Sequence, residues 1–532
     1  MRPLRTRKTK KIPETQLSQP LTSDIKQENL SLGSSLAENL ASFQTMFANC
    51  SDFAYRELKI GQEQVPVLLL YVNGITDEQT INQDILKSLV NIRCSNLEAS
   101  SSYNIEMIKN LFMEVGNIKE IYTIEEASDA ILTGSVALLI EGNARALIIE
   151  TKGPEGRPIS ESVTEGVVRG PREGFTESLR KNAALLRHKI KTSNLKMEKF
   201  VLGHSTKTEV YIVYLEGTAN PKVVAEVKKR ISLIKVDSVL ESGYIEELIE
   251  DSPFSLFPQI EHSERPDKIA AGILQGQVAI ITDGTPFVLI VPTMMFQFLH
   301  SSEDYYERSI YATSVRVVRF LFLNLALLLP ALYIAITTFH RELIPTPLLI
   351  SITAAREGGP FPTVVEVLMM EVTFEALREA GIRLPKPVGQ AVSIVGGLVI
   401  GDAAVQAAMV SPTTVIVVAL TGIASFGIPS YSFGLAIRIL RFGMILLAAT
   451  LGLFGLLLGL LVMQAHLVSL RSFGVPYFAP LAPFNLQDAK DLVMRFPWWA
   501  MGERPRLIAK NNNNRQRQKF FLKPAPPDEN EQ

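Results

Sequence analysis

The sequence has few cysteines and lacks the common catalytic and phosphate-binding motifs, which excludes several classes of protein. Its two cysteines, Cys50 and Cys94, lie far apart and form no C-x-x-C pair. This spacing is typical of a reducing compartment and argues against a disulfide scaffold or a thiolate metal site. The six histidines are scattered, and H-E-x-x-H, G-x-S-x-G and G-x-x-x-x-G-K-[ST] are all absent. We therefore predict no enzyme activity and no catalytic, cofactor-binding or metal-binding residue.

The chain also lacks a large net charge and a secretory signal. The formal net charge is −1, so the whole chain gives no reason to expect nucleic-acid binding. The start, MRPLRTRKTKK, is basic, but a polar stretch follows where a signal peptide has an apolar one. We predict that residues 1–44 form a disordered basic and polar arm.

Residues 45–312 have the pattern of an α/β protein, in which short apolar runs alternate with helical stretches. The Gly-, Pro- and Glu-rich stretch 152–174 suggests two subdomains, 45–165 and 166–312. No internal repeat is evident. The predicted strands are Val65–Val72, Val136–Ile140, Ala146–Glu150, Val210–Leu215, Val278–Ile281 and Phe287–Val291, and the predicted helices are Phe175–Lys191, Pro221–Ile234 and Tyr244–Glu250.

Residues 313–470 contain uncharged runs of a length that crosses a bilayer. Twenty residues of helix span roughly 30 Å, the thickness of the hydrocarbon core. We predict an all-α polytopic transmembrane domain, with one or two further passes in 343–377 and a tail at 471–532 whose end is disordered. The predicted spans are 320–339, 388–410, 412–430 and 442–465.

Basic residues predict the topology but do not give one consistent answer. Arg316 and Arg319 precede the first span, which places the α/β domain in the cytoplasm by the positive-inside rule. The tail is also basic, as are the clusters at 378–386 and 438–441. Four spans alone cannot place all of these clusters inside, so the number of spans stays open.

Asp402 is the ionisable side chain in the otherwise uncharged interior of 388–410. A carboxylate facing lipid costs several kcal/mol, so it should face a bundle interior or a wet cavity. One hypothesis is a ring of Asp402 carboxylates in a homo-oligomer, with Ile394, Leu398, Asp402 and Val405 along one helical stripe that lines a pore. The alternative is a single hydrogen bond to a neighbouring helix, with Ser411 and Thr421 as the candidate partners.

Two further features bear on helix packing. A G-x-x-x-G spacing lets two helix backbones approach closely, which predicts helix contacts and self-association at Gly397, Gly401, Gly455 and Gly459. Glu371, Glu375 and Arg378 fall on one face of a predicted helix, with Glu366 roughly opposite. That charged face is the alternative candidate for the lining of a pore. It carries charges of both signs, however, and would also suit a helix at the membrane interface.

Many ordered blocks of the sequence resemble the GerA family of spore germination proteins, and the resemblance covers roughly residues 45–485. The blocks in the first half are Arg169–Arg180, Glu241–Ile249, Ser252–Gln259, Glu264–Asp267, Asp283–Val291 and Glu303–Arg308. Those in the second half are Phe339–Pro345, Arg356–Pro362, Met370–Arg383, Val395–Val405, Ala424–Pro429 and Ser472–Phe478.

The resemblance implies the A subunit of a nutrient germinant receptor in the inner membrane of a spore. It implies a transporter-like B subunit and a lipoprotein C subunit as partners. It also implies a homo-oligomeric, pentameric channel that releases monovalent cations. The alternatives are a paralogue encoded in the SpoVA operon, a transporter component, and a receptor scaffold without a pore.

Overall fold

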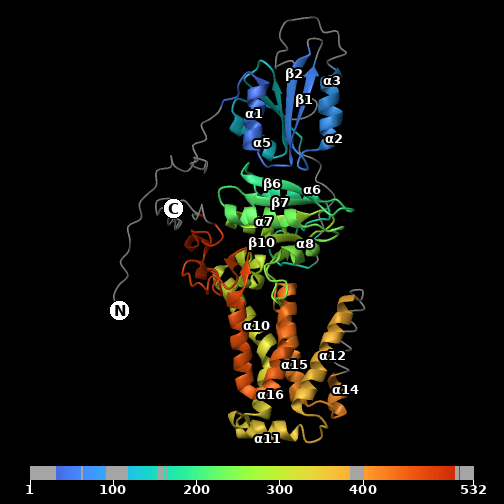
Figure 1. Cartoon of the computed structure of the whole chain (residues 1–532), viewed down its shortest axis with the longest axis vertical. Helices are drawn as coiled ribbons and strands as arrows, with labels where there is room; N and C mark the ends of the chain where they lie inside the picture. The colour runs from blue at the N-terminus through green and yellow to red at the C-terminus, as the bar shows by residue number, and fades with distance from the viewer. Residues whose placement is uncertain are drawn as a thin grey trace, which may run out of the picture. The chain divides into compact units, whose positions relative to one another are not determined.

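The computed structural model describes residues 31–60, 64–91, 118–151, 161–162, 164–383, 401–509 and 515. The chain forms two compact units (Figure 1). The first takes in Met1–Met46, Tyr55–Tyr71 and Glu78–Lys152, and the second takes in Phe47–Ala54, Val72–Asp77 and Gly153–Gln532. The predicted fold class, an α/β N-terminal part followed by an all-helical part, is confirmed. The predicted division at 165/166 and 312/313 stays a prediction.

The first unit is built on a five-stranded sheet in the order β1-β2-β4-β5-β3. The pairs β2/β4, β4/β5 and β3/β5 are antiparallel. Strand β4 is buried at every position, because its run SVALLI leaves no polar face for solvent. The elements are α1 (Leu36–Met46), β1 (Phe53–Ile60), β2 (Val65–Val72), α2 (Glu78–Thr80), η2 (Ile81–Leu86), α3 (Lys87–Asn91), β3 (Ile118–Ile121), α5 (Ile124–Leu132), β4 (Ser135–Ile140) and β5 (Ala146–Glu150).

The second unit begins with another five-stranded sheet, in the order β6-β7-β9-β10-β8, with antiparallel pairs throughout. Its two faces carry separate apolar cores, one under α6 and α9 and one under α7 and α8. The elements are α6 (Leu179–Lys189), β6 (Leu195–Leu202), β7 (Thr208–Leu215), α7 (Pro221–Leu233), α8 (Ser242–Ile249), β8 (Glu261–Ser263), α9 (Pro266–Gln275), β9 (Val278–Thr282) and β10 (Val288–Val291).

The two sheets have the same topology, so the expectation of no internal repeat is wrong. In each, a hairpin of two strands is followed by an edge strand, a helix and a second hairpin, and the spatial order is first, second, fourth, fifth, third. The sequences of the second hairpins also match, in ILTGSVALLIEGNARALII at 131–149 and ILQGQVAIITDGTPFVLIV at 273–291. Gly134 and Gly276 both end a helix with positive φ, which an L side chain adopts only at a cost.

The predicted apolar strands are confirmed as β2, β4, β5, β7, β9 and β10, and the predicted helices as α6, α7 and α8. The prediction missed the four edge strands β1, β3, β6 and β8, whose sequences mix charged and apolar residues, whereas the central strands are continuous apolar runs. Edge position relieves a strand of one neighbour, so its sequence carries a weaker apolar signal.

The helical region follows in the same unit. Helices α10, α12, α15 and α16 run side by side (Figure 1). We call the end of this region that contacts the second sheet the near end, and the opposite end the far end. The elements are η3 (Met295–Leu299), η4 (Ser302–Tyr305), α10 (Ser309–Thr338), η5 (Arg341–Leu343), α11 (Thr346–Ala354), α12 (Thr363–Arg383), α14 (Gly401–Gln406), α15 (Pro412–Phe426) and α16 (Tyr431–Ser469).

Contacts between the helices give their directions. Helix α10 runs from the near end to the far end, and α15 runs back, because Thr413 bonds Tyr333 at 2.9 Å while Gly427 packs on Phe322. Helix α12 runs parallel to α15, since Glu366 in its first turn bonds Ser411 and its other end lies beside the end of α15.

Helix α16 is a hairpin of two antiparallel arms. Its backbone is non-helical at Gly452, with φ 62° and ψ −141°. Phe433 in the first arm stacks on Phe298 with ring centroids 5.7 Å apart, and His466 in the second arm bonds Ser255 at 3.0 Å. Both ends of α16 therefore lie at the near end, and the turn lies at the far end beside Phe339. The arms 431–451 and 453–469 are about 31 Å and 25 Å long at 1.5 Å per residue.

Within the described residues, α10 and α16 are long and apolar enough to cross a membrane, and α15 is a shorter apolar helix. Helix α10 begins before the predicted span 320–339, and α11 and α12 occupy the segment 343–377. The predicted span 442–465 corresponds to parts of both arms of α16 and so contains a turn. Most of the predicted span 388–410 lies outside the described residues.

The near end of the helical region is joined to the second sheet by a continuous apolar core. Phe257 and Phe298 pack among side chains of α10 and α16, together with Tyr477 from the chain after α16. A short hairpin, β11 (Arg471–Ser472) and β12 (Val475–Pro476), leads from α16 back to the sheet, where Ser472 donates a hydrogen bond to the carbonyl of Gln259. The segment predicted as a tail is thus ordered over 471–509.

Candidate functional site

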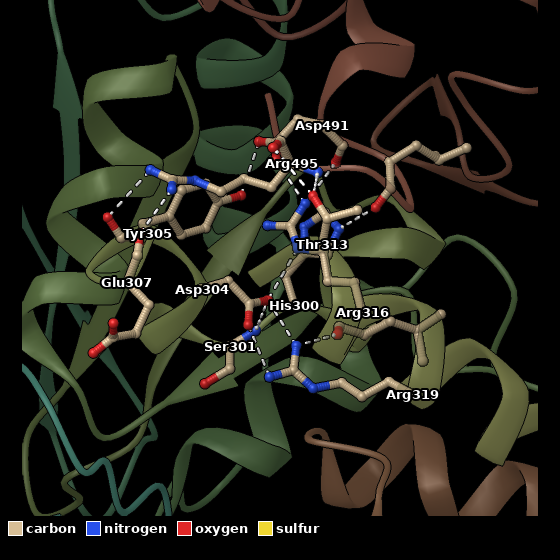
Figure 2. Close-up of polar contacts among 12 residues, drawn as sticks. His300, Ser301, Asp304, Tyr305, Glu307, Thr313, Arg316, Arg319, Asp491 and Arg495 are labelled. Atoms are coloured by element: carbon tan, nitrogen blue, oxygen red, sulfur yellow. Dashed lines mark hydrogen bonds and ion pairs between the residues drawn. The ribbon is translucent and has the colours of Figure 1, made fainter. Parts of the chain in front are cut away.

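Charged side chains gather at the near end of α10, where the chain passes from the second sheet into the helices. They come from the end of η3, from η4, from α10 and from the segment that follows the β11–β12 hairpin (Figure 2). We call this group the junction cluster; it consists of His300, Asp304, Tyr305, Arg316, Arg319, Asp491 and Arg495.

Asp304 is the central carboxylate of the junction cluster and is 3% exposed. Arg319 donates two hydrogen bonds to it, of 2.6 and 2.8 Å, and Arg316 donates a third of 3.0 Å. Burial alone would raise the pKa of Asp304, but the hydrogen bonds and charges of Arg319 and Arg316 bring that pKa below its ordinary value. The carboxylate is therefore held ionised between two guanidinium groups.

Local sequence explains how Asp304 is aimed at α10. Ser301 and Asp304 form a reciprocal capping box around η4, which fixes the short turn before the helix. Arg316 and Arg319 are three residues apart in α10 and share a helix face, so both reach the same carboxylate.

The C-terminal segment supplies the other half of the junction cluster. Asp491 accepts a hydrogen bond of 2.8 Å from Arg316 and another of 2.8 Å from the Tyr305 hydroxyl. Arg495, 4% exposed, donates to the carbonyl of Glu307 at 2.9 Å, and its backbone exchanges two hydrogen bonds with Thr313. The segment is thus held against the first turns of α10 by part-buried, charge-assisted contacts.

His300 lies half-buried in the junction cluster. Its Nε2 lies 2.9 Å from the carbonyl oxygen of Leu492. Burial, and then the positive charge of Arg316, lower the pKa of His300 to about 4. The imidazole is therefore neutral at physiological pH and serves as a hydrogen-bond donor to the C-terminal segment.

Charged groups also occur deep within the apolar helical region, and most pair within the chain. Glu371 of α12 accepts a hydrogen bond of 2.7 Å from Arg441 of α16, and both side chains are at most 2% exposed. One turn nearer the sheet, Glu375 pairs with Arg438 at 2.6 Å, and Arg378 bonds Ser425 at 2.5 Å. The predicted charged face thus binds α12 to α15 and α16.

Glu366, in the first turn of α12, is 2% exposed and accepts three hydrogen bonds from the start of α15. These come from the backbone and hydroxyl of Ser411 and the hydroxyl of Thr414, at 2.9–3.0 Å. Ser411 and Thr421 were the neighbours considered for Asp402. Ser411 binds Glu366 instead, and Thr421 donates to the carbonyl of Val417 in its own helix.

Asp402 differs from these carboxylates because it lies exposed on α14. It accepts a hydrogen bond of 2.7 Å from Gln406, one turn on in the same short helix. Gly401 packs against Val415, in the first turn of α15, so Asp402 lies close to the far end. Val405 is half-buried on the same helix, whereas Ile394, Gly397 and Leu398 lie outside the described residues.

The glycines of the second predicted pair lie inside the α16 hairpin. A Cβ added at Gly455 would be 2.2 Å from the carbonyl oxygen of Leu447, and one at Gly459 would be 2.7 Å from the sulfur of Met444. These glycines let the two arms of one chain approach closely.

Sequence reasoning missed the junction cluster, because Arg316 and Asp491 are 175 residues apart. The signal that could have found it is the pair Asp491 and Arg495 in an otherwise apolar and aromatic stretch, DLVMRFPWW. No group of three or more metal-ligating side chains was found among the described residues.

Comparisons with known proteins agree over nearly the whole chain. The family model described as Bacillus/Clostridium GerA spore germination protein matches residues 41–507. Spore germination protein KA of Bacillus subtilis (strain 168) is 46% identical over 92% of this chain and 90% of its own, and spore germination protein B1 of the same organism is 38% identical over 92% and 100%.

A solved structure also resembles part of the chain. It is the N-terminal domain of the A subunit of the Bacillus megaterium spore germinant receptor GerK3, at 36% sequence identity. The likeness covers 50% of this chain and 97% of that one, with a TM-score of 0.40.

Proposed function

Because the chain belongs to the GerA family of spore germination proteins, we propose that it is the A subunit of a nutrient germinant receptor and forms an oligomeric path for monovalent cations. The partners are a transporter-like B subunit and a lipoprotein C subunit. The location is the spore inner membrane, which α10, α12, α15 and the two arms of α16 cross.

The near end faces the cytoplasm in this proposal. Arg316 and Arg319 lie at the near end of α10, and Arg438 lies in the first turns of α16, close to the end of α12. The positive-inside rule favours the side that carries these clusters. The α/β part and the C-terminal segment would then share the cytoplasmic side.

One observation carries the proposal of a cation path: the exposed carboxylate of Asp402. Glu366, Glu371 and Glu375 take hydrogen bonds from groups in other helices, whereas the contact at Asp402 comes from its own helix. A carboxylate that faced lipid would cost several kcal/mol, so its surroundings in the assembly must be polar. A ring of Asp402 side chains from several copies, at the far mouth of a pore, meets that requirement and would concentrate cations.

The predicted stripe extends this path through residues that the structure does not describe. Leu398 lies one turn before Asp402 in the sequence and is proposed as an apolar constriction that gates by dewetting. Leu398→Ala should then leak cations without nutrient. The predicted contact between copies at Gly401 stays a prediction, because Gly401 is buried against Val415 of its own chain. If copies do meet there, Gly401→Leu should lower the yield of crosslinked oligomer.

Potassium release from liposomes that contain the purified chain, with and without the B and C subunits, tests the proposal. Asp402→Asn should reduce the release or its preference for cations, because the ring loses its charge. Glu379→Gln is the matched control, since Glu379 is an exposed carboxylate that pairs with Arg383 on α12. Equal release from all three proteins would remove Asp402 from the path.

A further inference from the structure

The segment 481–499, which follows the β11–β12 hairpin, has an inverted distribution of polar and apolar side chains. Of its four charged residues, Asp491 and Arg495 bind α10 and the turn before it (Figure 2), while Asp488 and Lys490 are half-buried. Its large apolar residues are exposed: Leu481 39%, Phe484 66%, Leu486 75%, Met494 58%, Phe496 41%, Trp498 47% and Trp499 53%.

This arrangement of polar and apolar side chains is not the one that contact with water favours. A surface segment in water normally exposes its charges and buries its aromatic side chains. A contiguous exposed apolar patch marks a surface that another apolar phase covers. Burying Arg495 while exposing its neighbours Met494 and Phe496 is favoured where the exterior is apolar.

The position of the segment relative to α10 identifies that exterior. The backbone of Arg495 bonds Thr313, which lies seven residues before Phe320, where the uncharged run of α10 begins. Seven residues of helix correspond to about 10 Å. A bilayer has headgroup regions of roughly 5–8 Å on either side of about 30 Å of hydrocarbon, so the segment lies at or just beside the headgroups.

The aromatic composition agrees with that depth. The chain contains two tryptophans, and both are adjacent in this segment. Tryptophan and tyrosine concentrate at the headgroup level, where the ring is in an apolar layer and its polar atom still finds a partner. Ile310 and Tyr311, 83% and 60% exposed on the first turn of α10, continue the same belt around the helix.

We propose that segment 481–499 lies at the headgroup level of the near face of the membrane, with Trp498, Trp499 and Phe496 in contact with lipid. The proposal rests on the membrane location given above, but not on a cation path. The occupant of this surface is the lipid leaflet that surrounds the helices. A second copy of the chain is the alternative occupant.

Native tryptophan fluorescence tests the proposal without added labels, because both tryptophans belong to the segment. The full chain is reconstituted in vesicles whose lipids carry bromine atoms either near the headgroup or near the chain end. Bromines near the headgroup should reduce the emission by about half, and those at the chain end should reduce it less. Both leaflets carry the quencher, so the orientation of the protein does not affect the result.

Tryptophan variants show which of the two tryptophans gives the quenched fluorescence. Trp498→Phe and Trp499→Phe, made singly, each leave one reporter in the segment. Val201→Trp in a background without Trp498 and Trp499 is the control, because Val201 is 55% exposed on β6 of the second sheet. That probe should respond to iodide in water and not to bromolipid.

Two results would overturn the proposal. Quenching of Trp498 and Trp499 by iodide and not by bromolipid would place the segment in water. Protection from both quenchers would place it under a second copy or another protein. Potassium release measured in the same vesicles separates this inference from the proposed function, since strong bromolipid quenching without release would sink the cation path and leave the lipid contact standing.

Discussion

His300 illustrates how one half-buried side chain makes the junction cluster sensitive to pH. The imidazole donates to the carbonyl of Leu492 in a part-buried site beside Arg316, and burial together with that charge favours the neutral form. Its folded-state pKa, about 4, is below the ordinary value of 6.5. An unfolded chain binds a proton at His300 below pH 6.5 while the folded chain does not, so protonation favours unfolding.

The resulting prediction is a loss of stability between about pH 6.5 and pH 4, worth about 3 kcal/mol at most for this group. The contribution is fully present above pH 6.5 and decreases as pH falls towards the folded pKa. His300→Gln keeps a hydrogen-bond donor for the carbonyl of Leu492 but removes the titrating imidazole. It should therefore flatten the dependence of stability on pH between pH 6.5 and pH 4. Thermal unfolding of the detergent-solubilised chain, followed by tryptophan emission at pH 7 and pH 5, measures the difference.

A matched control is His204→Gln, because His204 is exposed after β6. It should leave the pH profile unchanged. Asp304 affects stability over a second, more acidic pH range, because its pKa is lowered in the folded chain. Its contribution to the free energy of unfolding is present above the ordinary pKa of an aspartate, near 4, and is lost only as pH falls below that value. An unaltered slope in His300→Gln would show that His300 is not buried as described.

At this scale the sequence identified single residues better than partners. It singled out Asp402 and the group Glu371, Glu375 and Arg378 because charges in an apolar run are conspicuous. It could not show that arginines of α16 neutralise that group, since pairing across the fold depends on tertiary structure. The same limitation hid the contact of Arg316 with Asp491.

At the scale of elements, Gly452 is the residue that turns one apolar run into two helices. Its φ of 62° and ψ of −141° lie in a region that is strongly unfavourable for residues with a Cβ. A Cβ there would also lie 3.0–3.1 Å from His340 and Phe339. The run Phe442–Ala465 has no proline or charge at this point, so little in the sequence indicates the turn.

We predict that Gly452→Ala destabilises the chain by about 1–3 kcal/mol, because alanine must adopt a strained backbone. Gly443→Ala is the matched control: Gly443 is helical in the first arm, and no atom lies within 4 Å of an added Cβ. That change should be neutral or stabilise by up to about 1 kcal/mol through helix propensity. Denaturant unfolding in detergent compares the two, and equal effects would contradict the hairpin.

The ion pair between α12 and α16 gives a second prediction. Glu371→Leu or Arg441→Leu alone should cost about 3–5 kcal/mol, because each leaves an uncompensated buried charge. The double variant should recover most of that loss, since two leucines fill similar space without a charge. Yield of folded protein and unfolding in detergent form the double-mutant cycle. Additive losses would mean that the two side chains do not interact.

The elements that the sequence predicted well are those with a strong, short-range signal. Runs such as VPVLLLYV form central strands because every residue is apolar and many are β-branched. The duplication of the two sheets was missed because the shared residues are spread over two hairpins more than a hundred positions apart, at 131–149 and 273–291. Topology is shared more fully than sequence, so the structure was needed to see the repeat.

For the whole molecule, the α16 hairpin removes the conflict in the predicted topology. Arg316 and Arg319 lie in the first three turns of α10, and Arg438 lies in the first turns of α16. The C-terminal segment also contacts the junction cluster. All of these basic groups are at the near end. The sequence predicts the run 442–465 as one crossing. With a hairpin there, the chain crosses twice, and the C-terminal segment returns to the side from which α16 began.

This arrangement predicts which positions label from which side of the membrane. In a background with Cys50 and Cys94 replaced by serine, Gly358→Cys in the far loop should react with an impermeant maleimide on intact protoplasts. A Cβ at Gly358 would lie 3.7 Å from Ala408, an ordinary contact, so the change should not disturb the fold. Arg383→Cys, at the other end of α12 and with a side chain 77% exposed, should react only after permeabilisation.

The decisive position is the end of α16. If α16 were one straight helix of 39 residues, Tyr431 and Ser469 would lie on opposite sides of the bilayer, because about 58 Å exceeds its full thickness. In the hairpin both ends are at the near end, since Phe433 packs on Phe298 and His466 bonds Ser255. Tyr431→Cys and Ser469→Cys should therefore both stay unlabelled on intact protoplasts and both react after permeabilisation. Labelling of Ser469→Cys from outside, with Tyr431→Cys still protected, would require a single crossing and would separate the C-terminal segment from α10.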